Sequence, residues 1–287
     1  MIKINNLEVK YGKNIALYIK SLDIKKGEKV GVIGSNGAGK STFIKALLEL
    51  VDYSGEIKKD IDTKDIAVHM QFNNYAETVT VKDIIELIIN GKIEKNQVVK
   101  ELIEFFDFSD CLNKIYKKLS GGQKQRLTLI LVMASNSSLT IFDEVTSGLD
   151  FETREKLMKK LKEWYKYKDT TLILVSHYYE ELENLVDKLL ILDNGKVVDF
   201  GNKKDLFKKY CGNVVFIINN SEFNKKLFEK EKTVEISKEK LAILIDDKKE
   251  ERKIVDKLIE KDIDYTRTKN DIELVVTLAK MEESNEK

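Results

Sequence analysis

A glycine-rich loop is the first segment whose residue types could do chemistry. It follows a short apolar run at Lys29–Ile33 and precedes a stretch with helical apolar spacing. Its residues are Gly34, Ser35, Asn36, Gly37, Ala38, Gly39, Lys40 and Ser41. The spacing G-x-x-x-x-G-K-[ST] between a strand and a helix is that of a phosphate-binding loop. Glycines let successive backbone N–H groups point at phosphate oxygens, and the following helix adds its positive end.

Two side chains extend the chemistry of this loop beyond its backbone. Lys40 can reach the β- and γ-phosphates, and the Ser41 hydroxyl can ligate Mg²⁺. An ordinary glycine turn is the alternative interpretation, which the position between a strand and a helix disfavours. We therefore expect a nucleotide-phosphate site here.

Two carboxylates, Asp143 and Glu144, end an apolar segment that begins at Leu139. Ligands of open α/β sheets bind where such strands end. Asp143 is placed to hold Mg²⁺ through its water shell, and Glu144 can accept a proton from an attacking water. A charged strand end that merely faces solvent is the alternative, and the phosphate loop upstream makes it the weaker one.

A second anion site is predicted where small residues open another helix. Leu119 precedes the run Ser120, Gly121, Gly122 and Gln123, and a helical segment follows. Bare N–H groups and the helix dipole attract anions at such a start. One chain with two phosphate-binding helix starts suggests that each completes the other's site in a dimer.

The elements that must position these residues alternate between strands and helices. Strands are expected at Lys29–Ile33, near Lys64–Met70, and at Leu139–Phe142, Thr171–Val175 and Lys188–Leu192, the last entering a hairpin through Asn194-Gly195 and returning as Lys196–Phe200. The stretch from Val79 to about Met133 is predicted to be almost wholly helical. This alternation predicts an α/β fold with a mainly parallel sheet covered on both faces.

The pattern of expected strands and helices changes after Tyr210. Strands are expected at Val214–Ile218, Val234–Ile236, Leu241–Ile245 and Ile272–Leu278, with an amphipathic helix at Lys248–Lys261. We therefore predict a nucleotide-binding domain over residues 1–210, with a helical insert over about 73–135. A small α+β accessory domain is predicted over 211–287.

Composition narrows the function classes. The chain has 50 basic and 49 acidic residues, so the basic excess typical of nucleic-acid binding is absent. Cys111 and Cys211 have no neighbours at metal-ligand spacing, which suits a reducing compartment. The longest apolar stretch, Leu127–Ala134, is shorter than the roughly 20 residues of a membrane helix, and no leader is recognised. We expect no nucleic-acid partner and no direct membrane insertion.

Along the chain the phosphate loop comes first, then Leu119–Gln123, then Asp143 and Glu144. In this order and spacing the three motifs resemble those of the nucleotide-binding subunits of ABC transporters, which are P-loop NTPase cassettes. The resemblance covers about residues 2–205, and the run Leu119–Gln123 is the family's own hallmark. It implies ATP and Mg²⁺ as cofactors and ATP hydrolysis as the activity. One residue departs from the family's pattern: Val145 stands where proline usually follows the two carboxylates. We expect an altered loop stiffness with the chemistry retained.

The resemblance assigns roles residue by residue. It implies that Tyr11 stacks on adenine, that Gln71 senses Mg²⁺ and water, and that His177 hydrogen-bonds the γ-phosphate. The loop Ser147–Asp150 would reach across a dimer, and His69 is expected to be structural. The residues implied to contact the nucleotide are Tyr11, Gly34–Thr42 and Ser120–Gln123. Those implied to take part in catalysis are Lys40, Gln71, Glu144 and His177. Those implied to bind the metal are Ser41, Gln71 and Asp143.

The same resemblance implies two kinds of partner: a second cassette and separate membrane permease subunits. The permease is expected to dock at a groove beginning at Gln71 and running through Phe72, Asn73 and Tyr75. The segment from His177 onward looks most like exporter cassettes for drugs, peptides, bacteriocins or lipids. A cytoplasmic, peripheral membrane location is expected. Importer duty, a soluble ABC ATPase and a nucleotide sensor without turnover are the alternatives.

Overall fold

A nine-stranded sheet forms the centre of the fold, in the order β4-β1-β2-β9-β8-β3-β7-β6-β5. The computed structural model describes residues 1–70 and 75–285. The strands of this sheet are β1 (Ile2–Tyr11), β2 (Asn14–Ile24), β3 (Lys29–Ile33), β4 (Ser54–Lys59), β5 (Ala67–His69), β6 (Leu139–Asp143), β7 (Thr171–Val175), β8 (Lys188–Asp193) and β9 (Lys196–Asn202).

The middle of the sheet is parallel and its first edge is antiparallel. β3 pairs in parallel with β7 and β8, and β6 pairs in parallel with β5 and β7. β6 and β7 are apolar throughout or nearly so and buried along their whole length, as strands covered on both faces must be. β1 pairs antiparallel with β2 and β4, and β8 with β9. The predicted α/β class is confirmed.

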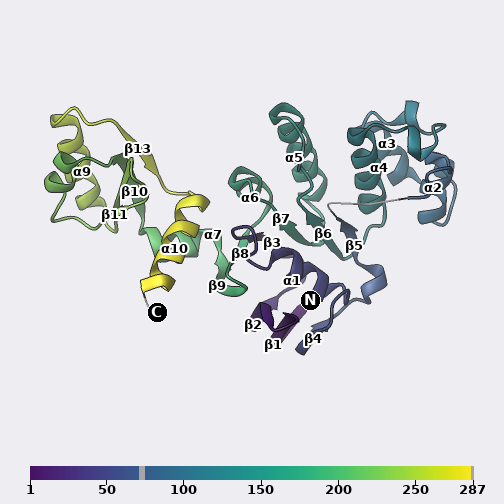
Figure 1. The fold of residues 1–287 in the computed structure, drawn as a ribbon. Helices are drawn as coiled ribbons and strands as arrows, with labels where there is room; N and C mark the ends of the chain where they lie inside the picture. The colour runs from purple at the N-terminus through teal and green to yellow at the C-terminus, as the bar shows by residue number, and fades with distance from the viewer. Residues whose placement is uncertain (71–74, 286–287) are drawn as a thin grey trace.

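Helices cover both faces of this sheet and extend to one side of it as an arm (Figure 1). Those beside the sheet are α1 (Lys40–Leu47), α5 (Phe151–Tyr165), α6 (Tyr179–Leu185) and α7 (Lys203–Cys211). The arm contains α2 (Val81–Ile88), α3 (Gln97–Phe105) and α4 (Gly121–Ala134), with short 3₁₀ turns between them. The predicted helical stretch is thus three helices separated by turns.

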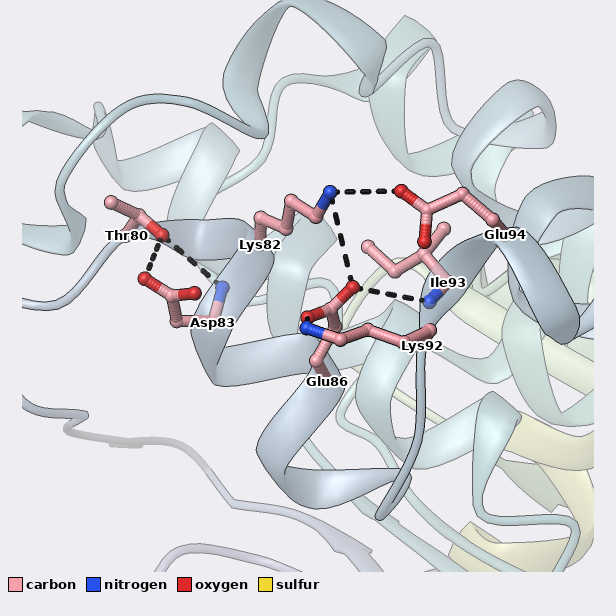
Figure 2. A network of polar contacts seen from close by, with 7 residues as sticks. All are labelled: Thr80, Lys82, Asp83, Glu86, Lys92, Ile93 and Glu94. Atoms are coloured by element: carbon pink, nitrogen blue, oxygen red, sulfur yellow. Dashed lines mark hydrogen bonds and ion pairs between the residues drawn. The ribbon is translucent and has the colours of Figure 1, made fainter.

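A polar network fixes the turn between α2 and the following segment of the arm (Figure 2). The largely buried carboxylate of Glu86 accepts hydrogen bonds from Lys92 Nζ at 2.6 Å and from the Ile93 backbone N–H at 3.3 Å. Lys82 Nζ lies 2.8 Å from a Glu94 oxygen, which joins the helix to the same turn. A buried charge needs such partners to offset its desolvation.

A second, four-stranded sheet follows α7, in the order β11-β12-β10-β13 with antiparallel pairs. Its elements are β10 (Val214–Asn219), α8 (Glu222–Leu227), β11 (Thr233–Glu235), β12 (Lys240–Ile245), α9 (Lys248–Glu260) and β13 (Tyr265–Thr268). The succession β-α-β-β-α-β is that of a ferredoxin-like unit. Alternate residues of β10 and β12 form a small apolar core with α9.

The expected strand at Ile272–Leu278 is wrong, because this segment is part of the helix α10 (Ile272–Asn285). A continuous apolar run has no period that separates a buried strand from a buried helix. α10 packs against α7, α6 and β9 of the larger unit, which is built on the nine-stranded sheet. Val215, Ala242 and Leu244 of the second sheet belong to the same apolar cluster as the side chains of α10. The buried side chains of α6 and α7 belong to that cluster too. Figure 1 shows α10 beside α7 near the C-terminus.

No helix among the described residues is both long and apolar enough to span a bilayer. Both cysteines are buried as free thiols. Burial raises the pKa of the Cys211 thiol to about 12, which keeps it protonated and unreactive at neutral pH.

Leu274 on α10 tests whether this helix belongs to the core of the larger unit. Its side chain is 3% exposed, so Leu274→Ala should lower the free energy of unfolding by about 2 to 5 kcal/mol, measured by urea denaturation. Leu87→Ala is the matched control, because Leu87 is 80% exposed and should lose at most about 0.5 kcal/mol. Equal, small losses for both variants would contradict this packing.

Candidate nucleotide site

A cavity of about 540 Å³ opens at the end of β3, where the phosphate loop leads into α1. Its lining combines the loop with residues of β2 and with the segments that follow β6, β7 and β8. The lining residues are Ile15, Ala16, Asn36, Gly37, Gly39, Lys40, Ser41, Thr42, Glu144, His177, Asn194 and Gly195. Gly34, Ser35 and Ala38 belong to the same loop but do not line the cavity, and Ala38 is buried.

The glycines of the loop meet two different physical demands. Gly37 and Gly39 have φ angles of 80° and 100°, a region that side-chain-bearing residues avoid. Gly34 is required for space, because a Cβ there would lie 2.4 Å from the Leu192 carbonyl oxygen. The loop therefore curls tightly over the end of β8, and α1 begins at Lys40 with its N–H groups toward the cavity.

Lys40 lies within the curl of the loop. Its Nζ donates hydrogen bonds to the carbonyl oxygens of Gly34 at 2.9 Å and Ser35 at 3.1 Å. Burial lowers the pKa of Lys40, and the carboxylates of Glu144 and Asp143 act in the opposite direction. A cation held between carbonyls and carboxylates can turn to phosphate oxygens.

Asp143 lies at the end of β6 and is buried. Burial raises the pKa of its carboxyl, the neighbouring Glu144 raises it further, and Lys40 and His177 lower it. Its Oδ1 has no hydrogen-bond partner among the described residues. A buried carboxylate oxygen and the hydroxyl of Ser41, which lines the cavity, are oxygen ligands of the kind that Mg²⁺ prefers.

Glu144 and His177 both line the cavity, and their side chains are in contact. His177 Nε2 lies 2.8 Å from Glu144 Oε1. Glu144 has a φ of 51°, a left-handed conformation that is costly for a residue with a side chain. Its N–H donates to the Val175 carbonyl at 3.0 Å, which ties the loop after β6 to the end of β7. This backbone bond holds the two loops together where the side chains of Glu144 and His177 meet.

Val145, the departure from the family's pattern, is fully buried. Its carbonyl accepts a hydrogen bond from the Gln125 side chain of α4. The segment after Glu144 is therefore held from the arm as well as from the sheet.

Sequence reasoning missed four lining residues: Ile15, Ala16, Asn194 and Gly195. Asn194-Gly195 was recognised only as a hairpin turn, although a Cβ at Gly195 would lie 2.8 Å from the Ala16 oxygen. Tyr11 lies at the end of β1, half exposed, and is not among the lining residues. It pairs with Asn14 in the hairpin that also carries Ile15, so it lies close to the cavity in the sheet.

The run Ser120–Gln123 lies at the start of α4 and lines no part of this cavity. Ser120 and Gln123 form a capping box: each side chain bonds the other's backbone N–H, at 3.3 and 3.0 Å. A Cβ added to Gly121 or Gly122 would meet open space, and neither residue has a positive φ. Nothing described in this chain therefore requires glycine at these two positions.

Gln71, Phe72 and Asn73 lie outside the described residues. Tyr75 is partly buried and packs edge-on against Tyr116, with ring centroids 5.4 Å apart. It therefore contributes to packing within the arm. His69 is buried in β5, where burial lowers its pKa to about 4, so the ring is neutral at pH 7.

Comparisons with known proteins identify the family to which the chain belongs. A family model described as "ABC transporter" matches residues 17–147. The chain is 34% identical over 228 residues to the energy-coupling factor transporter ATP-binding protein EcfA1 of Mycoplasmopsis synoviae, covering 73% of this chain and 85% of EcfA1. It is 31% identical over 225 residues to the methionine import ATP-binding protein MetN of Clostridioides difficile, covering 72% and 70%.

Among solved structures, the dimeric bacterial ABC transporter cassette MJ0796 superposes with a TM-score of 0.62 at 26% identity, covering 70% of this chain and 98% of that chain. The fold and the site thus define a P-loop ATPase of the cassette type. The chain belongs to the ATP-binding subunits of ABC transporters, and it is an ATPase.

Lys40→Ala tests the contact between the loop and nucleotide. Loss of a charge-assisted bond to phosphate costs about 1.5 to 3 kcal/mol, so the Kd for ATP, measured by calorimetry, should rise about 10- to 150-fold. Lys45→Ala removes the same charge from the exposed face of α1 and should change the Kd little. Equal effects of the two variants would show that only the general charge of the helix matters.

Proposed function

We propose that Glu144 and His177 carry out ATP hydrolysis at this cavity. The contact between His177 Nε2 and Glu144 Oε1 at the cavity mouth is the observation that supports this most. Glu144 would accept a proton from the attacking water, and His177 would hydrogen-bond the γ-phosphate. Lys40 and the loop N–H groups would hold the phosphates, and Tyr11 would stack on adenine.

Mg²⁺ is the second cofactor that we propose. Ser41 and Asp143 would hold it, the latter directly or through water, together with Gln71. When bound, the ion would neutralise charge on the β- and γ-phosphates. The Oδ1 of Asp143, which is buried and has no hydrogen-bond partner among the described residues, supports this assignment.

We propose further that the site is completed by Ser120–Gln123 of a second cassette. Among the described residues nothing lies within 4 Å of a Cβ added at Gly121 or Gly122, which leaves the backbone there open to a group outside the chain. A helix start with an exposed, uncrowded backbone suits close approach by phosphate oxygens. The similar cassette MJ0796 has a dimeric structure, which supports the proposal that two cassettes pair. The glycine in the loop Ser147–Asp150 likewise has open space around it.

Glu144→Gln should lower ATP turnover about 10²- to 10⁴-fold, because the proton acceptor is lost. ATP should still bind, so the variant should elute as a dimer in size exclusion with ATP. Adding Ser120→Arg should abolish that dimer without changing the Kd of the monomer. Near-normal hydrolysis by Glu144→Gln, or a dimer that survives Ser120→Arg, would contradict these assignments.

We propose that membrane attachment is peripheral and occurs through permease subunits. The arm carries exposed apolar side chains on α2, with Leu87 80% and Ile88 46% exposed. They lie on the helix that follows the predicted docking segment Gln71–Asn73. Because Tyr75 packs within the arm, the docking surface would consist of that segment and the outward face of α2.

Two directions of transport are proposed. The likeness of the His177 segment to exporter cassettes favours export of a drug, peptide, bacteriocin or lipid. The names of the relatives favour uptake, because MetN is a methionine import protein. The cassette chemistry is shared by both, so the permease would decide the direction and the cargo.

We propose that residues 211–287 form an accessory unit and residues 1–210 the catalytic one, with α10 as the joint between them. Lys280 of α10 forms an ion pair with Asp193 at 3.1 Å, and Ser35 of the phosphate loop lies 3.4 Å from the same oxygen. The accessory unit would thus contact the nucleotide site in the same chain. A truncation after Tyr210 would expose the apolar surface that α10 covers.

Inverted membrane vesicles that contain the cassette and its permease would test the direction. With ATP outside, an exporter should accumulate its cargo inside the vesicle. Vesicles with the Glu144→Gln cassette are the control and should accumulate none. ATP-dependent loss of preloaded cargo would instead establish import.

A further inference from the structure

Glu181 is a buried carboxylate that the proposed chemistry does not use. It lies on α6, three residues into the helix, with only 3% of its surface exposed. Its Oε1 accepts a hydrogen bond from Thr146 Oγ1 at 2.5 Å, and its Oε2 accepts one from Ser176 Oγ at 2.6 Å. Both hydroxyls are themselves buried. Each oxygen of the Glu181 carboxylate is therefore paired with a buried hydroxyl.

The two hydroxyls belong to the two segments that present the catalytic side chains. Thr146 lies two residues after Glu144, and Ser176 immediately precedes His177. The Ser176 oxygen also accepts a hydrogen bond from the backbone N–H of Tyr178 at 2.9 Å. This bond joins the residue before His177 to the residue after it. Glu181 thus bridges the loop after β6 to the loop after β7.

The contact between Glu144 and His177 lies on the cavity side of the same two loops. Glu144 also has a left-handed backbone, a conformation that persists only where its surroundings enforce it. The bond from the Glu144 N–H to the Val175 oxygen joins the loops at backbone level, and the Glu181 carboxylate joins them at side-chain level.

Desolvation is the cost of this arrangement. Burial raises the pKa of Glu181, while the bonds from Ser176 and Thr146 and the charge of Arg154 lower it. A buried carboxylate that only filled space would be poorer than an apolar residue of similar size. The two short hydrogen bonds that Glu181 accepts from separate loops offset the cost of burying its carboxylate.

We propose that Glu181 is a positioning residue that sets the distance and orientation between Glu144 and His177 by joining Thr146 to Ser176. It touches no reacting atom. This inference rests on the catalytic roles proposed for Glu144 and His177.

Glu181→Ala removes both bonds and should lower kcat about 10- to 100-fold, since small displacements of reacting groups cost this much. The KM and the Kd for ATP should change less than twofold, because the phosphate loop is untouched. Glu181→Gln can still bond both hydroxyls, with its amide oxygen and its NH₂ group, and should restore most of kcat. Glu180→Ala, the exposed neighbour on α6, is the matched control.

A second arm separates positioning from general destabilisation. In the Glu144→Gln background, Glu181→Ala should cause no further loss of turnover, because the group that it positions is already absent. The same 10- to 100-fold loss in both backgrounds, a parallel loss of ATP affinity, or an unchanged kcat would overturn the proposal. If Glu144→Gln by itself left turnover intact, the proposed function would fail, whatever the effect of Glu181→Ala.

Discussion

The register of three parallel strands is the constraint on which the site depends. Val32 of β3 lies beside Val175 of β7, and Val175 lies beside Asp143 of β6. Because parallel neighbours end at the same edge of a sheet, the phosphate loop, the two carboxylates and the His177 segment all leave the sheet at one place. A one-residue slip of β6 would move Asp143 and Glu144 to the opposite faces.

The second feature of the site is that two ionisable side chains, Lys40 and Asp143, are buried and partly removed from water. Lys40 donates to two carbonyls of its own loop, and Asp143 is buried with an oxygen that lacks a partner in the described structure. Burial lowers the pKa of Lys40 and raises that of Asp143, so both charged forms are less favourable here than in water. Phosphates would offset the cost at Lys40, and a divalent cation would offset the cost at Asp143.

The helix α6 connects the chemistry to the rest of the chain. On one side it places Glu181 between the loops that follow β6 and β7, and on another it packs against α10. α10 returns from the second sheet and reaches Asp193, at the end of β8, through Lys280. α10 therefore packs against elements that lead directly into the candidate nucleotide site, although it is the last element of the chain that the structure describes.

The sequence by itself determined the local chemistry: the phosphate loop, the carboxylate pair, the strands beside them and the hallmark at the start of α4. Each is encoded within a few residues, by glycine conformations, caps and apolar runs. Only the tertiary structure decided that Ile272–Leu278 is helical, that Asn194-Gly195 lines the cavity and that Glu181 bridges two loops. Those outcomes depend on which distant surface covers an apolar run and which side chains meet across strands, and no local pattern in one sequence carries that information.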